Sequence, residues 1–277
     1  MLSGERVPNL ELEEGELARV EENIKKFIRK SVDEAGMDGL VIGLSGGIDS
    51  TLTAYLAVDA IGADRTYGVI MPSKVNKEEN MHDAVQVAKD LEMDYSVIGI
   101  ESIVEEVEGV VGRSGLGGKL NIESDKVTGN LSGRIRAVIL YRIANSSNAM
   151  VIGTGNKTEA LIGYFTKYGD GAVDCHPIGN LYKCQVRQLA NWIGVPEKYI
   201  TKAPTAGLWE GQTDEKELGM DYDTLDSILF LLEEEGLSLI EIQDLLQVDK
   251  KQVHRVEQLH KESEHKRIVP PSPEKLF

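Results

Sequence analysis

The stretch Gly43-Leu44-Ser45-Gly46-Gly47-Ile48-Asp49-Ser50 decides the fold, because it joins an apolar run to a helical pattern. The apolar run, residues 40–44, is continuous and bounded by glycines, which is typical of a buried parallel strand. The helical pattern continues through residue 61. At such a junction the first helix N–H groups lack partners, and the helix dipole favours negative charge. The stretch therefore predicts a phosphate-binding loop between a strand and a helix.

This loop is neither of two common nucleotide-binding motifs. No Lys-Ser/Thr pair closes it, as a Walker A loop requires, and the spacing Gly-x-Gly-x-x-Gly is absent. Gly46 and Gly47 let the backbone approach a phosphate, and Ser45 and Ser50 can add hydroxyl donors. Asp49 would repel that phosphate unless a cation lay between them, so we expect it to hold Mg²⁺. The alternative is a glycine-rich turn in which Asp49 and Ser50 only cap the helix.

Composition limits the class of protein. The chain has 277 residues, 41% of them hydrophobic, which suffices for one large α/β domain or two small ones. It lacks a run of 18 apolar residues, and residues 1–6 lack the apolar core of a signal peptide. Cys175 and Cys184 cannot make a disulfide framework, so we expect a cytoplasmic protein. A formal net charge of −16 argues against nucleic acid as a partner.

Outward from the loop, strand-like runs alternate with helical patterns. The helical patterns cover residues 17–32, 77–91 and 130–147, and the strand-like runs cover residues 66–71, 95–100 and 150–154. This alternation predicts an α/β fold, a doubly wound parallel sheet with helices on both faces and right-handed crossovers.

Two glycine-rich stretches, residues 112–129 and 204–221, interrupt the alternation, and we expect both to be loops that act as lids. Residues 221–263 look entirely helical, and no clear linker precedes them. We therefore expect one domain over residues 1–277. Its parts would be an N-terminal helix (1–38), a nucleotide-binding α/β core (39–203), and a lid loop with C-terminal helices (204–277).

A second polar stretch follows the run at 150–154. It reads Gly153-Thr154-Gly155-Asn156-Lys157-Thr158-Glu159 and, further on, Gly163-Tyr164-Phe165-Thr166-Lys167-Tyr168-Gly169-Asp170-Gly171-Ala172-Val173-Asp174. A buried face does not need so many polar groups close together. Taken alone, the stretch fits an exposed loop as well as it fits a binding site.

Together, the two stretches resemble known motifs. Ser-Gly-Gly-x-Asp-Ser resembles the PP-loop of ATP pyrophosphatases, which holds the β and γ phosphates that leave as pyrophosphate. Thr154-(x)4-Glu159, Phe165 to Gly171 and Asp174 narrow the resemblance to the NAD synthetase family, over residues 20–266. Further matching pieces are Asn130 to Arg136, Pro177 to Lys183, Ala203 to Leu208, and His265-Lys266-Arg267.

This resemblance implies both an architecture and a reaction. The fold would be an adenine nucleotide α-hydrolase-like sheet with a C-terminal helical extension, and the protein a homodimer. The enzyme would be a ligase that uses ATP to activate the carboxylate of deamido-NAD as an acyl-adenylate. Ammonia would then displace AMP. Since only 38 residues precede the first strand, we expect no glutamine-using amidase domain and therefore free ammonia as the nitrogen source.

The resemblance also implies residue roles, none of them a covalent nucleophile. ATP would contact Gly43, Leu44, Ser45, Gly46, Gly47, Ile48, Asp49, Ser50, Thr154, Lys183 and Thr205. Asp49 and Glu159 would hold Mg²⁺. Deamido-NAD would contact Arg134, Lys167, Asp174, His265 and Lys266.

Two alternatives stay open. One is another PP-loop enzyme that amidates or thiolates a different substrate, although a thiolating enzyme needs catalytic cysteines and a basic face. The other is a nucleotide-binding regulator, because residues 238–246 and 249–262 imitate a helix-turn-helix. The net charge of −16 argues against a DNA-binding role. The three histidines within residues 250–267 are not spaced as metal ligands on one helical face.

Overall fold

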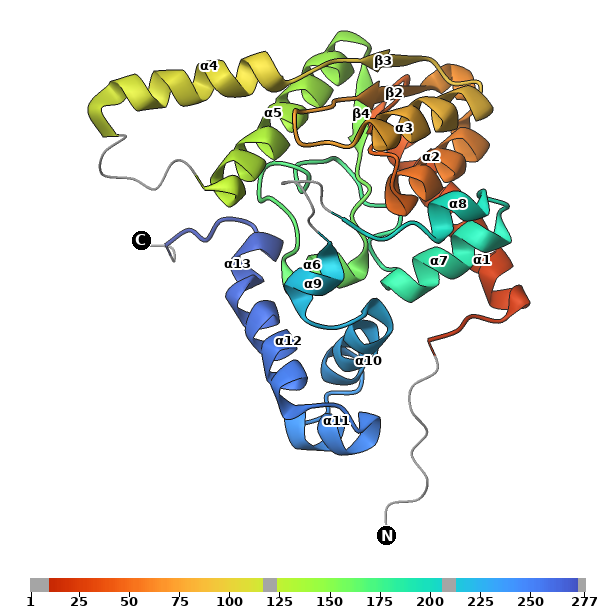
Figure 1. Cartoon of the computed structure of the whole chain (residues 1–277). Coiled ribbons are helices and arrows are strands. Elements are labelled where there is room, and N and C mark those ends of the chain that lie inside the picture. Colours follow the sequence, from red (N-terminus) through yellow and green to blue (C-terminus); the bar gives the residue numbers. More distant parts are fainter. Residues whose placement is uncertain (1–9, 117–123, 206–212, 274–277) are drawn as a thin grey trace.

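A computed structural model describes residues 10–116, 124–205 and 213–273 (Figure 1). Its sheet has four parallel strands, β1 (Gly39–Gly43), β2 (Thr66–Ile70), β3 (Tyr95–Val97) and β4 (Ala149–Ile152), in the order β3-β2-β1-β4. The helices of the core are α1 (Glu14–Ala35), α2 (Ile48–Ile61), α3 (Glu78–Asp90), α4 (Glu101–Val111), α5 (Asp125–Ser146), α6 (Lys157–Ile162), α7 (Lys183–Trp192) and α8 (Glu197–Ile200). The C-terminal helices are α9 (Asp214–Leu218), α10 (Tyr222–Glu233), α11 (Leu239–Leu246), α12 (Lys250–Glu262) and α13 (Glu264–Arg267).

The two faces of the sheet pack against different helices. Because side chains alternate along a strand, Leu40 and Ile42 of β1 point to one face and Val41 to the other. The first face packs on α1, α2, α3, α7 and α8, and the second packs on α4 and α5. Both faces of β1 are therefore buried, which explains its continuous apolar sequence. The predicted doubly wound α/β fold is confirmed.

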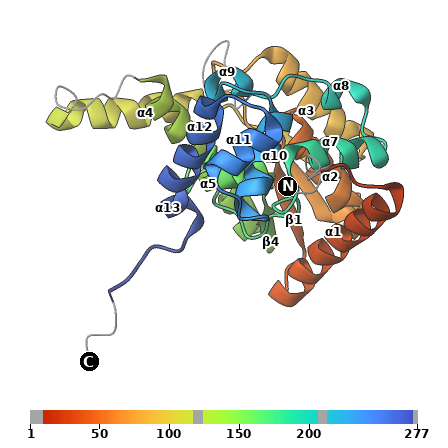
Figure 2. The same ribbon diagram turned by 90° about the horizontal axis from the view of Figure 1, so that it is seen from below.

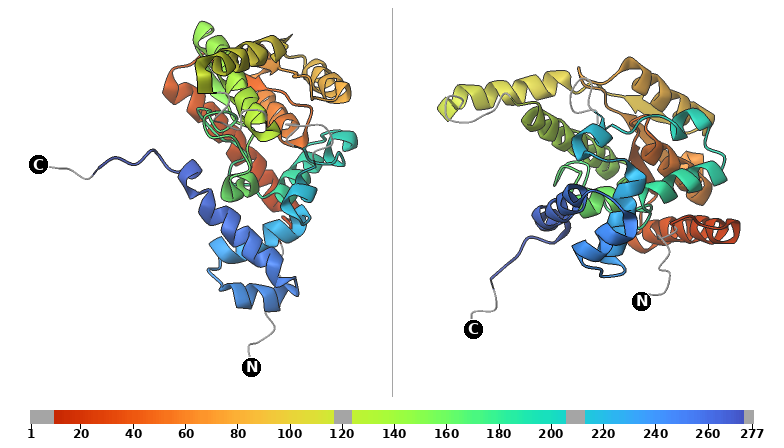
Figure 3. Two further views of the ribbon diagram at one scale, coloured as in Figure 1. Left: turned by 60° about the vertical axis from the view of Figure 1, so that its left-hand side comes forward. Right: turned by 60° about the horizontal axis from the view of Figure 1, so that its bottom comes forward.

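The C-terminal helices form a second core of their own. Leu225 and Ile228 of α10, Ile242 of α11 and Val256 of α12 are all fully buried in it. Ile162 at the end of α6 belongs to the same cluster. Figure 1 shows α10, α11 and α12 grouped at the lower end of the molecule, next to α6 and α7, and they also lie together in the other views (Figures 2 and 3). The extension thus packs against the segment that follows β4.

Neither predicted long loop is a continuous loop. Residues 112–116 continue the chain from α4 as a π-helix, and α5 begins at Asp125 inside the stretch predicted as a loop. Gly133 in α5 permits close packing, because a Cβ there would lie 3.3 Å from Thr166 Oγ1. In the second stretch, residues 214–218 form α9, since Leu218 packs into the C-terminal core. An internal part of each predicted lid, residues 117–123 and 206–212, lies outside the described residues.

The strand predicted for residues 95–100 is shorter in the structure. β3 ends at Val97, and α4 begins at Glu101. The other predicted strands and helices of the core are present, with ends that differ by a few residues. Among the described residues, the structure contains no helix that is long and apolar enough to cross a membrane.

Candidate functional site

The candidate site lies where the strand order reverses. β1 pairs with β2 on one side and with β4 on the other, so the loops that leave β1 and β4 diverge at this point. In open α/β sheets, ligands bind outside the carboxyl ends of the strands at such a point. A cleft of about 630 Å³ opens there, lined by the loop 43–50, by Thr154 and by Glu159. The structure therefore brings the two polar stretches of the sequence to one cleft.

The geometry of the phosphate loop depends on a glycine. Gly46 has a φ of +76°, and a Cβ at this position would lie 2.3 Å from the Asn80 carbonyl oxygen. The loop is closed by its own serines, because the Ser45 N–H donates to Ser50 Oγ at 3.2 Å and the Gly47 N–H donates to Ser45 Oγ at 3.2 Å. Gly47 is the N-cap of α2 and supplies no side-chain cap. The start of α2 consequently faces the cleft without a capping side chain.

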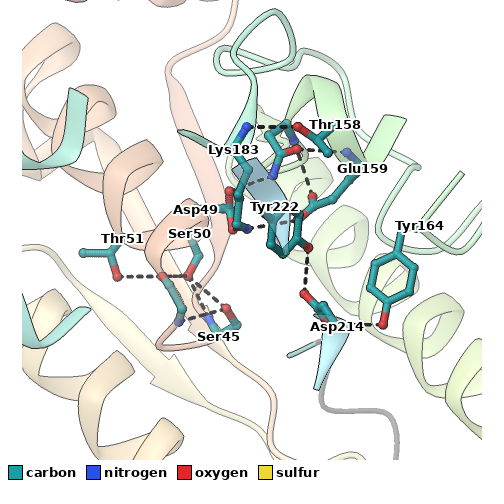
Figure 4. A network of polar contacts seen from close by, with 12 residues as sticks. Ser45, Asp49, Ser50, Thr51, Thr158, Glu159, Tyr164, Lys183, Asp214 and Tyr222 are labelled. Carbon is teal, nitrogen blue, oxygen red and sulfur yellow. Dashed lines mark hydrogen bonds and ion pairs between the residues drawn. The ribbon is translucent and has the colours of Figure 1, made fainter. Parts of the chain in front are cut away.

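Asp49 does not cap α2, which rules out the plainer alternative for this residue. Its carboxylate instead accepts hydrogen bonds from two groups beyond the loop (Figure 4). One is the Asn156 side-chain amide at 2.9 Å, and the other is the Lys183 ammonium group. Asn156 lies in the segment that follows β4, and Lys183 is the first residue of α7. The carboxylate is thus held between three segments that are distant in the sequence.

Lys183 is the central charge of the site. Its side chain is only 2% exposed, and its Nζ contacts both Asp49 and, at 3.2 Å, Glu159 Oε1. Burial alone would lower the pKa of Lys183, but the two carboxylates outweigh burial and raise it. Burial raises the pKa of Glu159, with Lys183 opposing the rise and the neighbouring Asp49 adding to it. The site therefore holds two acidic groups and one basic group in a weakly hydrated position.

Asp49 and Glu159 fit the chemistry of a magnesium site. Mg²⁺ binds carboxylate oxygens and usually completes its shell with water and substrate phosphates. The two carboxylates converge on the Lys183 ammonium group, and the raised pKa of Glu159 reflects burial and a repulsion from Asp49 that a divalent cation would relieve. The described part of the chain contains no group of three or more His, Cys, Asp or Glu residues that could hold a metal ion without further ligands. A metal here would need oxygen ligands from a bound nucleotide or water.

A layer of buried polar groups lies behind this centre, and the sequence motifs did not reveal it. Thr158 donates to Asp226 of α10 at 2.5 Å, and Tyr222 donates to Asp214 at 2.9 Å. Tyr164 donates to the same Asp214 at 3.2 Å (Figure 4). A signal for Asp226 was present, because it is a charged residue within the apolar stripe of α10. Its place next to the site could not be read from that stripe.

The sequence-predicted substrate residues lie in two groups. Thr154, Lys183, Thr205 and Lys266 line the cleft with the phosphate loop. Arg134, Lys167, Asp174 and His265 are described but are not part of its lining. These residues have protein partners: Arg134 Nε donates to the Lys167 carbonyl at 3.3 Å, Asp174 accepts from Tyr141 at 3.0 Å, and Lys167 donates to the His265 carbonyl.

Lys266 is also engaged by the protein. Its Nζ donates to the carbonyl oxygens of Gly163 and Phe165, each at 2.7 Å. Burial lowers the pKa of Lys266, and nearby Asp170 opposes that effect. Lys266 therefore fixes the backbone of the polar stretch that begins at Gly163.

The comparisons agree with this geometry. The family model described as "NAD synthase" matches residues 20–270. The chain is 47% identical to the NH(3)-dependent NAD(+) synthetase of Halobacterium salinarum, covering 96% of both chains. It is also similar to the solved NMN synthetase from Francisella tularensis, at 33% identity, 96% and 100% coverage and a TM-score of 0.82. A solved NH3-dependent NAD synthetase from Campylobacter jejuni matches at 28% identity, 93% and 99% coverage and a TM-score of 0.76.

Proposed function

The chain belongs to the NAD synthase family, and we propose that it is an ammonia-dependent NAD synthetase. It is a ligase that forms a C–N bond between ammonia and the nicotinate carboxylate of deamido-NAD, and it uses ATP as co-substrate. The observation that carries this proposal is the meeting of the phosphate loop, Asp49, Glu159 and Lys183 in one cleft. These groups suit a triphosphate, and a polar stretch for the second substrate lies next to them.

The reaction runs in two steps. The nicotinate carboxylate attacks the α-phosphorus of ATP, the bond to the β-phosphate oxygen breaks, and pyrophosphate leaves. The resulting acyl-adenylate has an electrophilic carbonyl carbon. Ammonia attacks this carbon, loses a proton, and AMP leaves with the electron pair of the broken C–O bond. The products are NAD, AMP and pyrophosphate.

The residues of the cleft act by positioning and by charge neutralisation rather than as nucleophiles. The backbone of Gly46 and Gly47 and the hydroxyls of Ser45 and Ser50 would cradle the phosphates that leave. Lys183 would neutralise charge on the same phosphates. Asp49 and Glu159 would hold Mg²⁺, which when bound neutralises the triphosphate further. Thr154 and Thr205, also in the cleft lining, would contact ATP.

For deamido-NAD we propose the set implied by the family motifs. It consists of Arg134, Lys167, Asp174, His265 and Lys266. Arg134 offers a planar fork for a phosphate or carboxylate, and Asp174 offers acceptors for ribose hydroxyls. Lys266 would act mainly through the backbone of Gly163 and Phe165, to which it is bonded.

A second candidate substrate comes from the comparison with an NMN synthetase. The corresponding acid is nicotinate mononucleotide, which carries the same carboxylate but lacks the adenylate half of deamido-NAD. Pyrophosphate release with ATP and ammonium should be measured with each acid at equal concentration. We expect release that depends on deamido-NAD. A higher kcat/KM for the mononucleotide would show that the chain is an NMN synthetase.

A homodimer is proposed as the working form. Several apolar side chains of α4 and α5 are exposed, with Val110 54% and Val138 69% accessible. Ile103 and Val107 of α4 are exposed as well. Surfaces of this kind mark contacts between proteins. Light scattering should give the mass of two chains, and Val138→Asp should shift the equilibrium toward one chain. We place the enzyme in the cytoplasm, since both Cys175 and Cys184 are free thiols.

The test of the metal assignment is Asp49→Asn. We expect pyrophosphate release to fall by roughly 100-fold or more, the order found when a charge-stabilising group is removed from an active site. The far-UV circular dichroism of the variant should match that of the parent chain. Near-normal release would mean that Asp49 has no part in holding the triphosphate and its metal.

A further inference from the structure

A fully buried carboxylate joins the C-terminal helices to the site. Asp226 of α10 has 0% exposure. One of its oxygens, Oδ1, accepts a hydrogen bond from Thr158 Oγ1 at 2.5 Å. The other, Oδ2, accepts from the Cys184 backbone N–H at 2.8 Å. A single side chain thus bonds the first turn of α6 and the first turn of α7.

The network continues from Thr158 to the backbone of the central lysine. Thr158 Oγ1, which donates to Asp226, accepts from the Lys183 backbone N–H at 2.9 Å. Thr158 is followed directly by Glu159, and Lys183 is followed by Cys184. The network therefore fixes the backbone at both Glu159 and Lys183. Glu159 follows Thr158 in the chain, and the N–H groups of Lys183 and of the next residue are bonded to Thr158 and Asp226.

These bonds use groups that a helix start leaves free. The first N–H groups of a helix have no partner inside the helix. In α7, the N–H of Lys183 and the N–H of Cys184 are two of them, and Thr158 and Asp226 accept their hydrogen bonds. A negative charge at this end of the helix is also favoured by the helix dipole. The direction in which α7 begins, and hence the origin of the Lys183 side chain, is set by these bonds.

Packing of α10 does not require a carboxylate at this position. Leu225, Ile228 and Leu229 surround Asp226 in the sequence and are fully buried in the C-terminal core. A buried carboxylate is unfavourable compared with an apolar side chain unless its hydrogen bonds repay the desolvation. Apart from the Cys184 thiol, the partners that Asp226 bonds belong to the network around Lys183 and Glu159.

We propose that Asp226 is a positioning residue: through Thr158 and the start of α7 it sets where Lys183 and Glu159 meet Asp49. This proposal rests on the proposed function, because it assigns Asp226 a part in binding and turning over ATP. It also gives the C-terminal helices a direct part in the site, because this carboxylate of α10 bonds the first turns of both α6 and α7.

The test compares kcat and KM for ATP in four single variants of the full chain and in the double variant Asp226→Asn with Thr158→Val. Asp226→Asn keeps the volume, but its NH2 group accepts no hydrogen bond, so one of the two bonds that the carboxylate accepts is lost. Thr158→Val removes the hydroxyl, and Thr158→Ser restores it. Leu229→Ala is the control, because it weakens the same helix at a buried position that makes no polar contact with the site. Melting temperatures are measured for all four, and activity is measured well below them.

We expect Asp226→Asn and Thr158→Val to lower kcat/KM for ATP roughly 10- to 100-fold, the range for groups that orient metal-binding residues. Thr158→Ser should retain activity within about 3-fold, which corresponds to about 0.7 kcal/mol at 25 °C. Because Thr158 and Asp226 form one chain of bonds, the double variant should be little worse than the poorer single variant. Leu229→Ala should keep kcat/KM despite an equal or larger fall in melting temperature, and Ile228→Val replaces it if that variant does not fold.

An Asp226→Asn enzyme that keeps kcat/KM within about 3-fold would overturn the proposal. So would an equal loss of activity in Leu229→Ala, because the effect would then follow stability alone. If the parent chain itself released no pyrophosphate with either acid, the proposed function would fail instead. The positioning role would in that case be decided by calorimetry with magnesium-ATP: weaker binding only in the Asp226 and Thr158→Val variants supports it, and unchanged binding refutes it.

Discussion

Removing the Lys183 charge should destabilise the protein because it leaves two carboxylates facing each other. Lys183→Met keeps a long apolar side chain at a position that is 2% exposed, so packing changes little. Breaking a buried ion pair by removing one partner costs about 3–5 kcal/mol. Asp49 and Glu159 keep 18% and 20% side-chain exposure, which screens part of their repulsion. We therefore expect a loss near the lower end, about 3 kcal/mol of unfolding free energy at neutral pH.

The loss should depend on pH in a defined direction. The pKa of Glu159 is already raised by burial and by Asp49, while Lys183 lowers it, so the variant should raise it further. A carboxyl group with a higher pKa in the folded state binds more protons there than in the unfolded chain. Stability of the variant therefore falls as pH rises above the ordinary glutamate range. The difference from the parent chain should be larger at pH 8 than at pH 5.

Urea unfolding followed by circular dichroism measures this difference, provided that the slope m is the same in both proteins. Lys30→Met is a matched control. Lys30 pairs with Glu34 at 3.7 Å, but both side chains are about 70% exposed, so its loss should change stability by less than about 0.5 kcal/mol. A loss below about 1 kcal/mol for Lys183→Met, or one that does not grow with pH, would refute this arrangement of the three charges.

Three further outcomes are expected. Gly163→Ala should lower the free energy of unfolding by about 2–4 kcal/mol, because φ is +67° and a Cβ would lie 2.1 Å from Ser263 Cβ. Gly36→Ala is the control, with φ +65° and open space around it, and should cost only about 1 kcal/mol in the same urea titration. Equal losses would exclude the contact with Ser263. Gly46→Ala should abolish most pyrophosphate release, because its Cβ would meet the Asn80 carbonyl; an active variant would show that the loop need not hold its present shape. Burial raises the pKa of Asp226 to about 6, so the parent chain should lose roughly 2.4 kcal/mol more than Asp226→Asn as pH rises from 4 to 7 in denaturant titrations, and parallel stability profiles would argue against a buried titrating carboxyl.

The sequence was informative where the signal is local. The strand before the phosphate loop is a continuous apolar run, the loop is rich in glycine, and α2 follows with a helical pattern. Each of these signals comes from fewer than about twenty neighbouring residues, so a linear reading can detect it. The parallel order of the strands then follows from the alternation of strands and helices. This is why the edge of the sheet that carries the site was predictable.

Helix α4 and the first turn of α5 were not predicted from the sequence, for a different reason. In α4, Val and Ile residues recur through Glu101–Val111, and β-branched side chains lower helix propensity. In α5, Gly129 lies in the stretch predicted as a loop, but it is buried in the helix. Gly133, one turn later, allows the polar stretch after β4 to pack closely. Tertiary packing outweighs local preference at both places, and it leaves no mark in the spacing of residues.

The residues of the site were predictable from the sequence, but their arrangement was not, because it also depends on tertiary packing. Motifs pointed to Asp49, Glu159 and Lys183 separately, as two metal ligands and an ATP contact. Lys183 is 134 residues from Asp49 in the chain, and only the fold shows that its ammonium group lies between the two carboxylates. Asp226 belongs to no recognised motif, and its role depends on its bonds to the first turns of α6 and α7, which only the fold shows.

The contacts of the C-terminal helices argue against the regulator that their sequence also suggested. A helix-turn-helix protein presents its second helix to a DNA groove. Here Val253 and Val256 of α12 are buried in the C-terminal core, and polar groups just after α12 and in α13 are bonded to the chain itself. Arg267 donates to the Leu161 carbonyl at 2.6 Å, and Ser263 donates to the same oxygen at 3.3 Å.

Leu161 lies in the last turn of α6, where free carbonyls attract a cation. The first turn of the same short helix carries Thr158 and Glu159 and is bonded to Asp226 of α10. The C-terminal helices thus hold α6 at both ends, and a change that loosened them would move Glu159 relative to Lys183. Lys266 and Arg267, at the end of these helices, bond backbone carbonyls of residues 161–165 beside the phosphate cleft, as expected for helices that support a ligase site.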